Sequence, residues 1–434
     1  MPKEPSSNFT PTISRVLADG TMIELIYDAD KGETCLAHCP PSGTPTLESK
    51  ISPTEKETLI PYGAANNLLT SGCVLLPSAV GEFTNKASLL TDIKAFIHRY
   101  VDLSPLFEDI AAHYVLLTWV HDAFNELGYL RFRGDFGTGK TRALLAVGSL
   151  CYKPFFASGA STVSPIFHIL HEFGGTLVLD EADLRFSDAT ADLTKILNNG
   201  NMKGLPVLRT MTNRHRELNP QAFKVFGPKL IAMRQSFADE ALESRFLTEE
   251  TGQRPMRDDI SIHLPDTMKL EAQNLRNSLL AWRFATRNNI AIDPARAIDG
   301  ISPRGNQTAL ALLSLIDDPA LRAAIGTHLA MGEARAAAKR NSLPHIAMVE
   351  VLDRMFRRAP RPYLPLADVA QQFNEGADIA MPIKSVGHIV RTRLGIETAK
   401  TRGVYVIPIA EKGKVDALAS RYGLTREEQK THPN

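Results

Sequence analysis

A stretch of eight residues, Gly134 to Thr141, constrains this chain more than any other part of its sequence. It reads Gly-Asp-Phe-Gly-Thr-Gly-Lys-Thr and fits the pattern G-x-x-x-x-G-K-[ST], hereafter the phosphate loop. An alternating segment, Tyr129 to Arg133, precedes it and an apolar helical run, Arg142 to Leu150, follows, which is the strand, loop and helix context that the pattern requires. Backbone N–H groups of such a loop surround a phosphate, and the helix N-terminus adds positive potential. The sequence therefore predicts a nucleotide site made by Gly134, Gly137, Thr138, Gly139, Lys140 and Thr141.

An acidic strand end further along the chain supplies the groups that a hydrolysing site needs. The apolar-rich segment before Asp180 and Glu181 is typical of a buried parallel strand whose carboxyl end faces the phosphate loop. Asp180 and Thr141 are expected to hold Mg²⁺, Lys140 to contact the terminal phosphates, and Glu181 to polarise the attacking water. The alternative is an acidic strand end that caps the next helix. We therefore expect ATP and Mg²⁺ as cofactors and ATP hydrolysis as the reaction.

Length and composition indicate a soluble globular protein. The chain has 434 residues, 44% hydrophobic and 22% charged, so about two to four domains are expected. Forty-nine Lys and Arg against 48 Asp and Glu leave a net charge of +1, so contact with nucleic acid must come from a local basic patch. No apolar run reaches about 18 residues, and the N-terminus lacks the basic-then-apolar order of a signal peptide. We expect a cytoplasmic protein without a membrane span.

The four cysteines are too few and too scattered for a disulfide framework. Cys35, His38 and Cys39 are close in sequence, and Cys73 could complete a zinc site, but this spacing is a weak signal for zinc. Ordinary thiols in a reducing cytoplasm are the favoured interpretation, and we do not predict a structural metal.

Changes of pattern along the chain predict an α/β protein with several parts. Short alternating runs broken by prolines occupy the first part, and helical periodicity follows from Ser88 onward. One strand is expected between the phosphate loop and the acidic strand, an order that resembles the additional-strand ATPases. The predicted parts are a β-rich N-terminal accessory region (1–80), an ATPase core with a parallel sheet sandwiched by helices (81–265), a helical lid and linker (266–340), a winged helix-turn-helix (341–410) and a C-terminal tail (411–434).

Two downstream segments resemble parts of the AAA+ ATPases. Asp239 to Phe246 reads Asp-Glu-Ala-Leu-Glu-Ser-Arg-Phe and is similar to the segment that ends in their arginine finger. Phe226 to Met233 resembles the strand that carries their first sensor. The resemblance covers about residues 115 to 330 and implies an AAA+ P-loop core with a helical lid. It also implies that Arg245 reaches the γ-phosphate of a neighbouring subunit, which requires a ring or an open helical oligomer. A surface arginine in an ordinary helix is the alternative.

The same resemblance identifies two candidate nucleotide sensors. Gln235 is the candidate first sensor, although Arg234-Gln235 stands where many members have Asn or Thr. Arg304, in Ser-Pro-Arg-Gly-Asn at a helix start, is similar to a second-sensor arginine of the lid. A helix start disfavours a cation, so an anionic partner such as the nucleotide would explain Arg304. A solvated arginine is the alternative.

An insertion between Glu181 and the sensor strand is predicted to form a β-hairpin. The stretch 197–209 contains two Asn/Gly turn signals around strand-like residues. In superfamily 3 and MCM-type helicases a hairpin at this place projects into the ring channel and grips the nucleic-acid backbone, so the resemblance implies Lys203 as its basic tip. A solvated basic loop is the alternative. Candidate supports for the tip are Arg209, Arg214 and Arg216.

The last part of the chain has the pattern of a winged helix-turn-helix. Three helices are expected, ending near 358, 374 and 394, followed by a hairpin over 396–407. Between residues 331 and 410 there are 12 Lys and Arg against 7 Asp and Glu, a local net charge of +5 that favours DNA. A protein-interaction module is the alternative. Candidate phosphate contacts are Lys384, His388 and Arg391 on one helix face, and Lys400 and Arg402 in the wing.

Together these features predict an ATP-driven, ring-forming DNA motor. Thr118-Trp119, the strand before the phosphate loop and the Leu-Asp-Glu-Ala-Asp segment resemble helicase-like ATPases of phages, plasmids and other mobile genetic elements. That resemblance implies a homo-oligomer, expected as a hexamer, that acts as a DNA helicase in replication. Single-stranded DNA is expected in the ring channel and duplex DNA at the winged helix. The alternative is a non-unwinding AAA+ initiator, loader or regulatory ATPase on duplex DNA; a protein-remodelling machine is least favoured.

Overall fold

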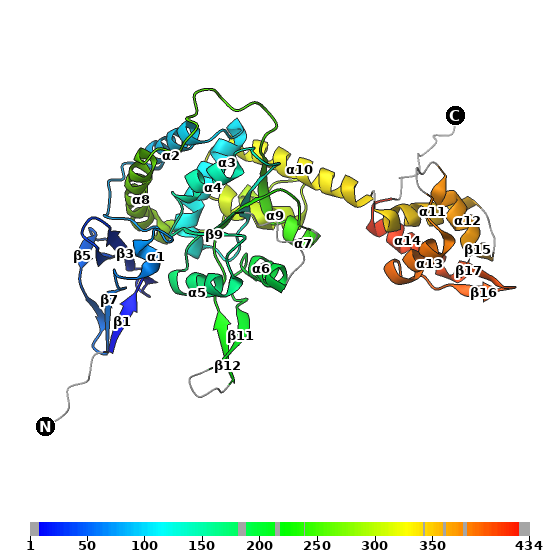
Figure 1. Ribbon diagram of the computed structural model, residues 1–434, viewed down its shortest axis with the longest axis horizontal. Helices are drawn as coiled ribbons and strands as arrows, with labels where there is room; N and C mark the ends of the chain where they lie inside the picture. The colour runs from blue at the N-terminus through cyan, green and yellow to red at the C-terminus, as the bar shows by residue number, and fades with distance from the viewer. Residues whose placement is uncertain are drawn as a thin grey trace. The chain divides into compact units, whose positions relative to one another are not determined.

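The computed structural model shows a mixed α/β protein (Figure 1) and describes residues 8–180, 188–212, 218–237, 239–341, 343–358, 362–375 and 380–424. The chain divides into two compact units, Met1–Leu329 and Ala330–Asn434, and helix α10 (Pro319–Asn341) contains the boundary. The first unit comprises the regions predicted as accessory region, ATPase core and most of the lid. The second contains the predicted winged helix-turn-helix.

A five-stranded parallel sheet forms the centre of the first unit. Its order is β14-β8-β13-β10-β9, and each pair of neighbours is parallel. The strand expected between the phosphate loop and the acidic strand is present in sequence as β9, and in the sheet β13 separates β8 from β10. The strands are β8 (Tyr129–Arg133), β9 (Phe155–Ser158), β10 (Leu177–Asp180), β13 (Lys229–Met233) and β14 (Phe246–Glu250).

Helices cover both faces of this sheet because both faces are apolar. Leu130 and Val178 lie in one hydrophobic core, whereas their strand neighbours Tyr129 and Leu177 lie in another. This alternation is the period-two geometry of a strand that is buried on both sides. The first core contains residues of α2 (Lys86–Tyr100), α3 (Pro105–Val120), α4 (Lys140–Gly148), α8 (Thr267–Thr286) and α9 (Pro303–Leu313), and the second contains residues of α5 (Val163–Phe173) and α6 (Asp188–Asn199).

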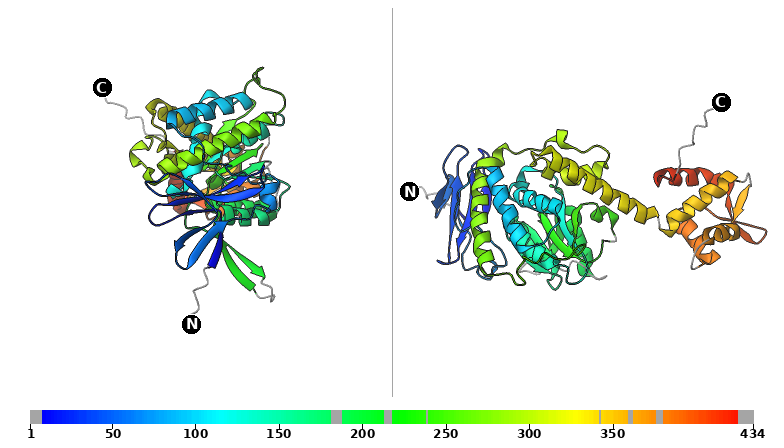
Figure 2. Two further views of the ribbon diagram at one scale, coloured as in Figure 1. Left: turned by 90° about the vertical axis from the view of Figure 1, so that its left-hand side faces the viewer. Right: turned by 90° about the horizontal axis from the view of Figure 1, so that it is seen from above.

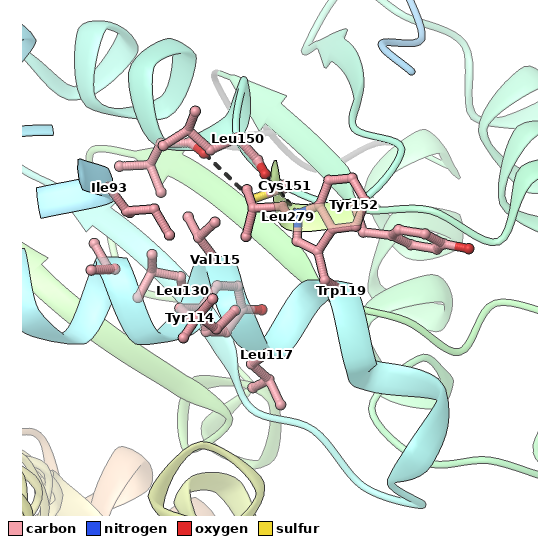
Figure 3. Close-up of a cluster of buried hydrophobic side chains, with 14 of the residues drawn as sticks. Ile93, Tyr114, Val115, Leu117, Trp119, Leu130, Leu150, Cys151, Tyr152 and Leu279 are labelled. Atoms are coloured by element: carbon pink, nitrogen blue, oxygen red, sulfur yellow. Dashed lines mark hydrogen bonds between the residues drawn. The ribbon is translucent and has the colours of Figure 1, made fainter. Parts of the chain in front are cut away.

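Helix α3 supports the strand that leads into the phosphate loop. Its Trp119 is fully buried, and Nε1 donates a hydrogen bond of 2.8 Å to the Leu150 carbonyl oxygen (Figure 3). The Tyr114 hydroxyl lies 3.1 Å from the carbonyl oxygens of both Gly128 and Lys229, just at the starts of β8 and β13. Because these buried polar atoms have partners, the large aromatic side chains add apolar contact without an unpaired group. The helix therefore fixes β8 and β13 side by side.

The N-terminal residues form two small sheets, and one of them packs against α8 (Figure 2). Glu24 of β3 is buried and accepts hydrogen bonds of 2.8 Å from Arg283 Nε and from the Tyr152 hydroxyl. Lys153 Nζ lies 3.1 Å from the same carboxylate. A buried carboxylate needs several such partners. The strands are β1 (Asn8–Thr12), β7 (Glu57–Pro61) and β6 (Ile51–Thr54) in one sheet, and β2 (Ser14–Val16), β3 (Met22–Asp28), β4 (Glu33–Cys39) and β5 (Thr46–Glu48) in the other.

The second unit has its own core, formed by helices and an antiparallel sheet of order β15-β17-β16. Residues 411–434 were expected as a tail, but 412–421 form helix α14, whose Val415 and Ala419 are buried in this core. Two apolar residues four positions apart are too short a pattern to predict that helix. The elements are α11 (Pro344–Arg358), β15 (Tyr363–Pro365), α12 (Leu366–Asn374), α13 (Ile383–His388), the π-turn η4 (Ile389–Arg393), β16 (Ala399–Thr401), β17 (Val404–Pro408), η5 (Ile409–Glu411) and α14 (Lys412–Arg421).

Two kinds of feature are absent from the described ranges. Within them, the structure contains no helix with the length and apolar character that crossing a bilayer requires. The same ranges contain no group of three or more His, Cys, Asp and Glu side chains placed to bind a metal ion. All four cysteines are free thiols.

Candidate functional site

The phosphate loop joins the end of β8 to the start of α4, as its pattern predicts. Gly137 and Gly139 have φ of +77° and +84°, in the left-handed region that glycine adopts without strain. A Cβ atom on Gly134 would lie 2.4 Å from Thr251 Oγ1, so that position has no room for a side chain. Gly139 is the residue that precedes the first turn of α4. The glycines therefore shape a loop whose N–H groups precede a helix N-terminus, which is the geometry that binds phosphate.

Thr141 and Asp180 meet across the sheet, although 39 positions separate them in sequence. The Thr141 hydroxyl donates a hydrogen bond of 2.8 Å to Asp180 Oδ2, and Asp180 is the last residue of β10. A hydroxyl and a carboxylate are oxygen ligands suited to Mg²⁺, so the pair fits the predicted metal position. Lys140 Nζ donates to the carbonyl oxygen of Asp135 within the loop. Glu181, the predicted polarising group, lies outside the described residues.

A second wall of the phosphate loop comes from the residues that follow β14, and sequence reasoning missed it. Thr251 N donates to the Arg133 carbonyl oxygen at 2.7 Å, and the Thr251 and Thr138 hydroxyls lie 2.8 Å apart. Gly252 has φ of +81°, and a Cβ atom there would lie 2.5 Å from Thr138 Cγ2. A Thr-Gly pair after a strand was the available signal. It gains meaning only from the pairing of β14 with β8.

The candidate first sensor follows β13 at the same edge of the sheet as the phosphate loop. β13 lies between β8 and β10, so the residues after Met233 leave the sheet between the phosphate loop and Asp180. Gln235 and Arg234 are both exposed there. The Arg234 guanidinium lies 5.8 Å from the centroid of Phe136, an exposed phosphate-loop residue. The structure thus places Gln235 at the expected edge.

Arg245 lies at the opposite end of the sheet. Its carbonyl oxygen accepts a hydrogen bond from Tyr129 N at 2.8 Å, at the point where β8 begins. The phosphate loop begins where β8 ends, five residues later, which is about 17 Å at about 3.3 Å per residue. Burial lowers the pKa of the half-buried Arg245, and the neighbouring charge of Arg304 acts in the same direction. The chain therefore does not bring Arg245 to its own phosphate loop.

Arg304 accompanies Arg245 and is not brought to the phosphate loop of its own chain. It lies in the first turn of α9, and its Nη2 donates to the Ala241 carbonyl oxygen at 2.8 Å. Ala241 belongs to α7 (Glu240–Glu243), which leads into Arg245. Thr308 of the same helix donates to the Ser244 carbonyl oxygen at 3.1 Å. The predicted lid arginine faces the amino end of the sheet because α9 packs on the α7 turn.

The predicted hairpin exists, but it is displaced along the chain and Lys203 is not its tip. The strands are β11 (Val207–Thr212) and β12 (Leu218–Phe223), which pair from Val207–Phe223 to Thr212–Leu218. Asn199-Gly200, taken as a turn signal, instead ends α6. Lys203 lies before the hairpin, where its N donates to Asn125 O at 2.9 Å and its Nζ to Asp122 O at 2.7 Å.

Two of the three supporting arginines cannot be placed, and the third faces a helix. Residues 213–217, which join β11 to β12 and include Arg214 and Arg216, lie outside the described residues. Arg209 of β11 donates to Asp192 Oδ2 at 2.7 Å, and its guanidinium lies 4.5 Å from the Phe167 ring centroid. Arg209 is therefore bound by α5 and α6, and the hairpin projects beyond α5 (Figure 1).

In the second unit the predicted basic residues are exposed on neighbouring elements. Lys384 lies on α13, and Arg391 lies on η4, the turn that continues α13. Arg402 has φ of +50° in the turn between β16 and β17. The Arg391 guanidinium and Lys400 Nζ lie 5.8 and 5.9 Å from the centroid of the half-exposed Tyr405. Basic side chains of η4 and β16 therefore lie on the same tyrosine. His388 is exposed in the last turn of α13.

Comparison with known proteins gives distant structural likenesses only. No protein-family model matches the chain, and no curated protein matches it. Two solved A-form apo structures of the NrS-1 C-terminal region are similar at 11% identity, with TM-scores of 0.40 and 0.39, over 89% of this chain and 96% of theirs. A JCV helicase structure is similar at 16% identity, with a TM-score of 0.24, over 61% of this chain and 65% of that one.

Proposed function

We propose that this chain is an ATP-driven DNA motor of the AAA+ class, a ring helicase that serves replication of a phage or mobile element. The observation that carries the proposal is the hydrogen bond from Thr141, at the start of α4, to Asp180, at the end of β10. It brings the phosphate loop and the acidic strand end together. The sheet order places an additional strand between them, as the resemblance to additional-strand ATPases implies.

Each residue of this site has a role in hydrolysis. The loop N–H groups and Lys140 bind the phosphates, and Thr141 and Asp180 hold Mg²⁺, which neutralises charge on the β and γ oxygens when it is bound. Thr251 and Gly252 hold the loop from the side of β14. Glu181, next to Asp180 in sequence, is the group proposed to polarise the attacking water.

Arg245 supports the proposal that the active site is shared between subunits. It lies at the far end of the sheet from its own phosphate loop, so it can complete a site only in a neighbouring copy. An arginine supplied in trans stabilises the charge that develops on the γ-phosphate. Arg304 lies beside Arg245 through the shared α7 turn, and we propose that both act on the neighbour's nucleotide. A closed arrangement of this head-to-tail contact is a ring, proposed as a hexamer.

The hairpin β11–β12 and the second unit are the proposed DNA contacts. The hairpin projects from the first unit (Figure 1), and the sequence joining its strands, Asn-Arg-His-Arg-Glu, carries two arginines. The second unit combines helices with a three-stranded antiparallel sheet and exposes Lys384, Arg391 and Arg402, which supports the proposal of a winged helix that binds DNA. Phosphate contacts from such residues position DNA without reading its sequence.

A strand-displacement assay tests the motor. Purified protein with ATP and Mg²⁺ is expected to hydrolyse ATP faster on single-stranded DNA and to displace an annealed strand in one polarity, whereas Lys140→Ala does neither. Hydrolysis on single-stranded DNA without displacement in either polarity contradicts the helicase proposal. That result would favour the second candidate, a non-unwinding initiator or loader, to which the exposed basic side chains of the second unit would supply duplex binding.

A further inference from the structure

Arg245 is held inside its own chain by the C-terminal end of α6. Its Nη1 donates to the Leu197 carbonyl oxygen at 3.3 Å and, more closely, to Asn198 Oδ1. Carbonyl groups at a helix C-terminus carry partial negative charge and attract a cation. Within the described residues, the buried Nε of Arg245 has no hydrogen-bond partner. The guanidinium is therefore bound, but part of its hydrogen-bonding capacity is unused, and a stronger acceptor elsewhere can compete for it.

Asn198 is itself oriented by Asp239. Its Nδ2 donates to Asp239 Oδ2 at 3.0 Å, and the other oxygen of Asp239 accepts from Ala241 N at 2.9 Å at the start of α7. The hydrogen bond from Asn198 is the largest of the effects that lower the pKa of Asp239. Because the carboxylate can only accept from Asn198, the amide nitrogen must point to Asp239 and the amide oxygen to Arg245. The two contacts of Asn198 thus fix each other.

The end of α6 is also the root of the hairpin. The Gly200 carbonyl oxygen, two residues after Asn198, accepts from Gly227 N at 3.1 Å and from Lys229 Nζ at 3.2 Å. Lys229 also donates to the carbonyl oxygens of Val225 and Gly227, at 3.0 and 2.9 Å. A Cβ atom on Gly200 would lie 2.3 Å from Lys229 Nζ, so the chain segments are in close contact. The segments that lead into and out of β11–β12 are therefore joined directly behind Asn198.

We propose that Asn198 is a positioning residue that holds Arg245 at the hairpin root, and that Arg245 leaves Asn198 to engage the neighbouring subunit's nucleotide. The inference rests on the proposed function, in which Arg245 acts in trans. Nη1 cannot serve Asn198 and a phosphate in another subunit at once. When it leaves, Leu197 and Asn198 lose their cation at the point where α6 meets the hairpin. Occupancy of one subunit's nucleotide site is thereby communicated to the hairpin of the next.

Two variants of the full chain, with opposite expected effects, test whether Asn198 holds Arg245. Asn198→Leu keeps the side-chain size and removes both hydrogen bonds, so position 198 no longer holds Arg245. ATPase activity without DNA is therefore expected to rise about two- to tenfold, the population change that one hydrogen bond can produce. The double variant Asn198→Asp with Asp239→Asn keeps the bond between the two positions and the start of α7, but presents a carboxylate to Arg245. Its activity without DNA is expected to fall by a similar factor. DNA-stimulated kcat is expected to stay near wild type in Asn198→Leu.

Asn199→Leu is the matched control, because the same substitution one position later removes no side-chain hydrogen bond of the described residues, and its activity is expected to be unchanged. A merely structural role lowers the activity of both Asn198 variants, and that result, or no change in either, overturns the proposal. If Asn198→Leu does not fold, judged by thermal unfolding, Asn198→Ala, which removes the same two hydrogen bonds, replaces it with the same expected rise in activity without DNA. Mixing Arg245→Ala with Lys140→Ala subunits tests the trans role of Arg245 separately. If ATPase activity does not recover, the trans role of Arg245 is wrong. If it recovers but Asn198→Leu leaves the activity without DNA unchanged, only the role of Asn198 in holding Arg245 is overturned.

Discussion

The two ends of the central sheet are built from opposite kinds of polar group. At the carboxyl end, the phosphate loop presents N–H groups beside the oxygen atoms of Thr141 and Asp180, a set that is completed by a phosphate and a cation. At the amino end, Lys229 and Arg245 are surrounded by carbonyl oxygens of their own chain. One end is shaped for a ligand, and at the other the two cations have neutral acceptors of their own chain.

The difference supports the proposal that a single copy is an incomplete enzyme. Cations that are bound only by neutral carbonyl groups gain less electrostatic stabilisation than cations paired with an anion. In the proposed oligomer, Arg245 would gain by exchanging its acceptors Leu197 and Asn198 for a phosphate of another copy. In the proposed oligomer, the cations at the amino end of one copy complement the phosphates bound at the carboxyl end of the next.

Removing Arg245, the proposed arginine finger at the amino end of the sheet, is expected to have the largest effect on ATPase activity. Arg245→Ala should lower kcat for ATP by about 10³-fold or more, because a trans arginine neutralises charge on the γ-phosphate. Activity should return when these subunits are mixed with Lys140→Ala subunits, since each supplies the end of the sheet that the other lacks. Steady-state ATPase measured across mixing ratios checks this, and a flat response at every ratio would make the two ends independent.

Removing the loop lysine is expected to have the next largest effect. Lys140→Ala should reduce ATPase by about 10²- to 10³-fold, as the loss of one preorganised donor to the phosphates does. Lys195→Ala is the control, because Lys195 is an exposed lysine of α6 whose ion pair with Asp192 lies on the surface. Equal losses in the two variants would show that general charge, and not the loop, matters.

The carboxyl end was predictable from sequence because its information is local. Gly134 to Thr141 and the strand before it are continuous in the chain. The structure places β8 on the predicted residues, and α4 begins and ends two residues before the predicted run 142–150. Asp180 was placed correctly at a strand end because an apolar run stopped at an acid. The mixed α/β fold with its parallel sheet followed from the same short patterns.

The amino end and the hairpin depended on long-range contacts that no local pattern carries. Arg304 was expected to contact a nucleotide, but α9 packs on the α7 turn and directs Arg304 to Ala241, away from the phosphate loop of its own chain. Lys203 was expected at a hairpin tip, but residues after Gly200 run beside 125–127 before the hairpin starts. Thr251 gained its role only through the pairing of β14 with β8. The roles of all these residues in catalysis and DNA binding stay predictions.

Acid is expected to destabilise the amino end through His121. This histidine is buried beside Tyr152 and Phe226, and burial lowers its pKa to about 4 from 6.5. Between these pH values His121 is protonated in the unfolded chain but neutral in the folded chain. The free energy of unfolding therefore falls as the pH drops from 6.5 toward 4, by up to about 3 kcal/mol. Denaturant unfolding at several pH values measures it. His121→Asn, which keeps a donor near the Nδ1 position for Thr118 O, should flatten that part of the profile; an unchanged slope would assign the acid sensitivity to other groups.

Loosening the second wall of the phosphate loop is expected to give the smallest effect. Thr251→Val keeps the shape of the side chain but removes the hydroxyl that contacts Thr138 Oγ1 and the Arg133 carbonyl oxygen. Loss of about 1 kcal/mol of hydrogen bonding should raise the Kd for ATP about fivefold, measured by nucleotide titration. Thr251→Ser retains the hydroxyl and should bind near wild type.

The variant Thr251→Val also tests whether the two ends of the sheet are mechanically linked. Thr251 is fixed through the pairing of β14 with β8, and Arg245 directly precedes β14. If Thr251→Val also lowers the recovery of activity in mixed subunits, β14 transmits strain between them; if only nucleotide affinity changes, each end acts on its own.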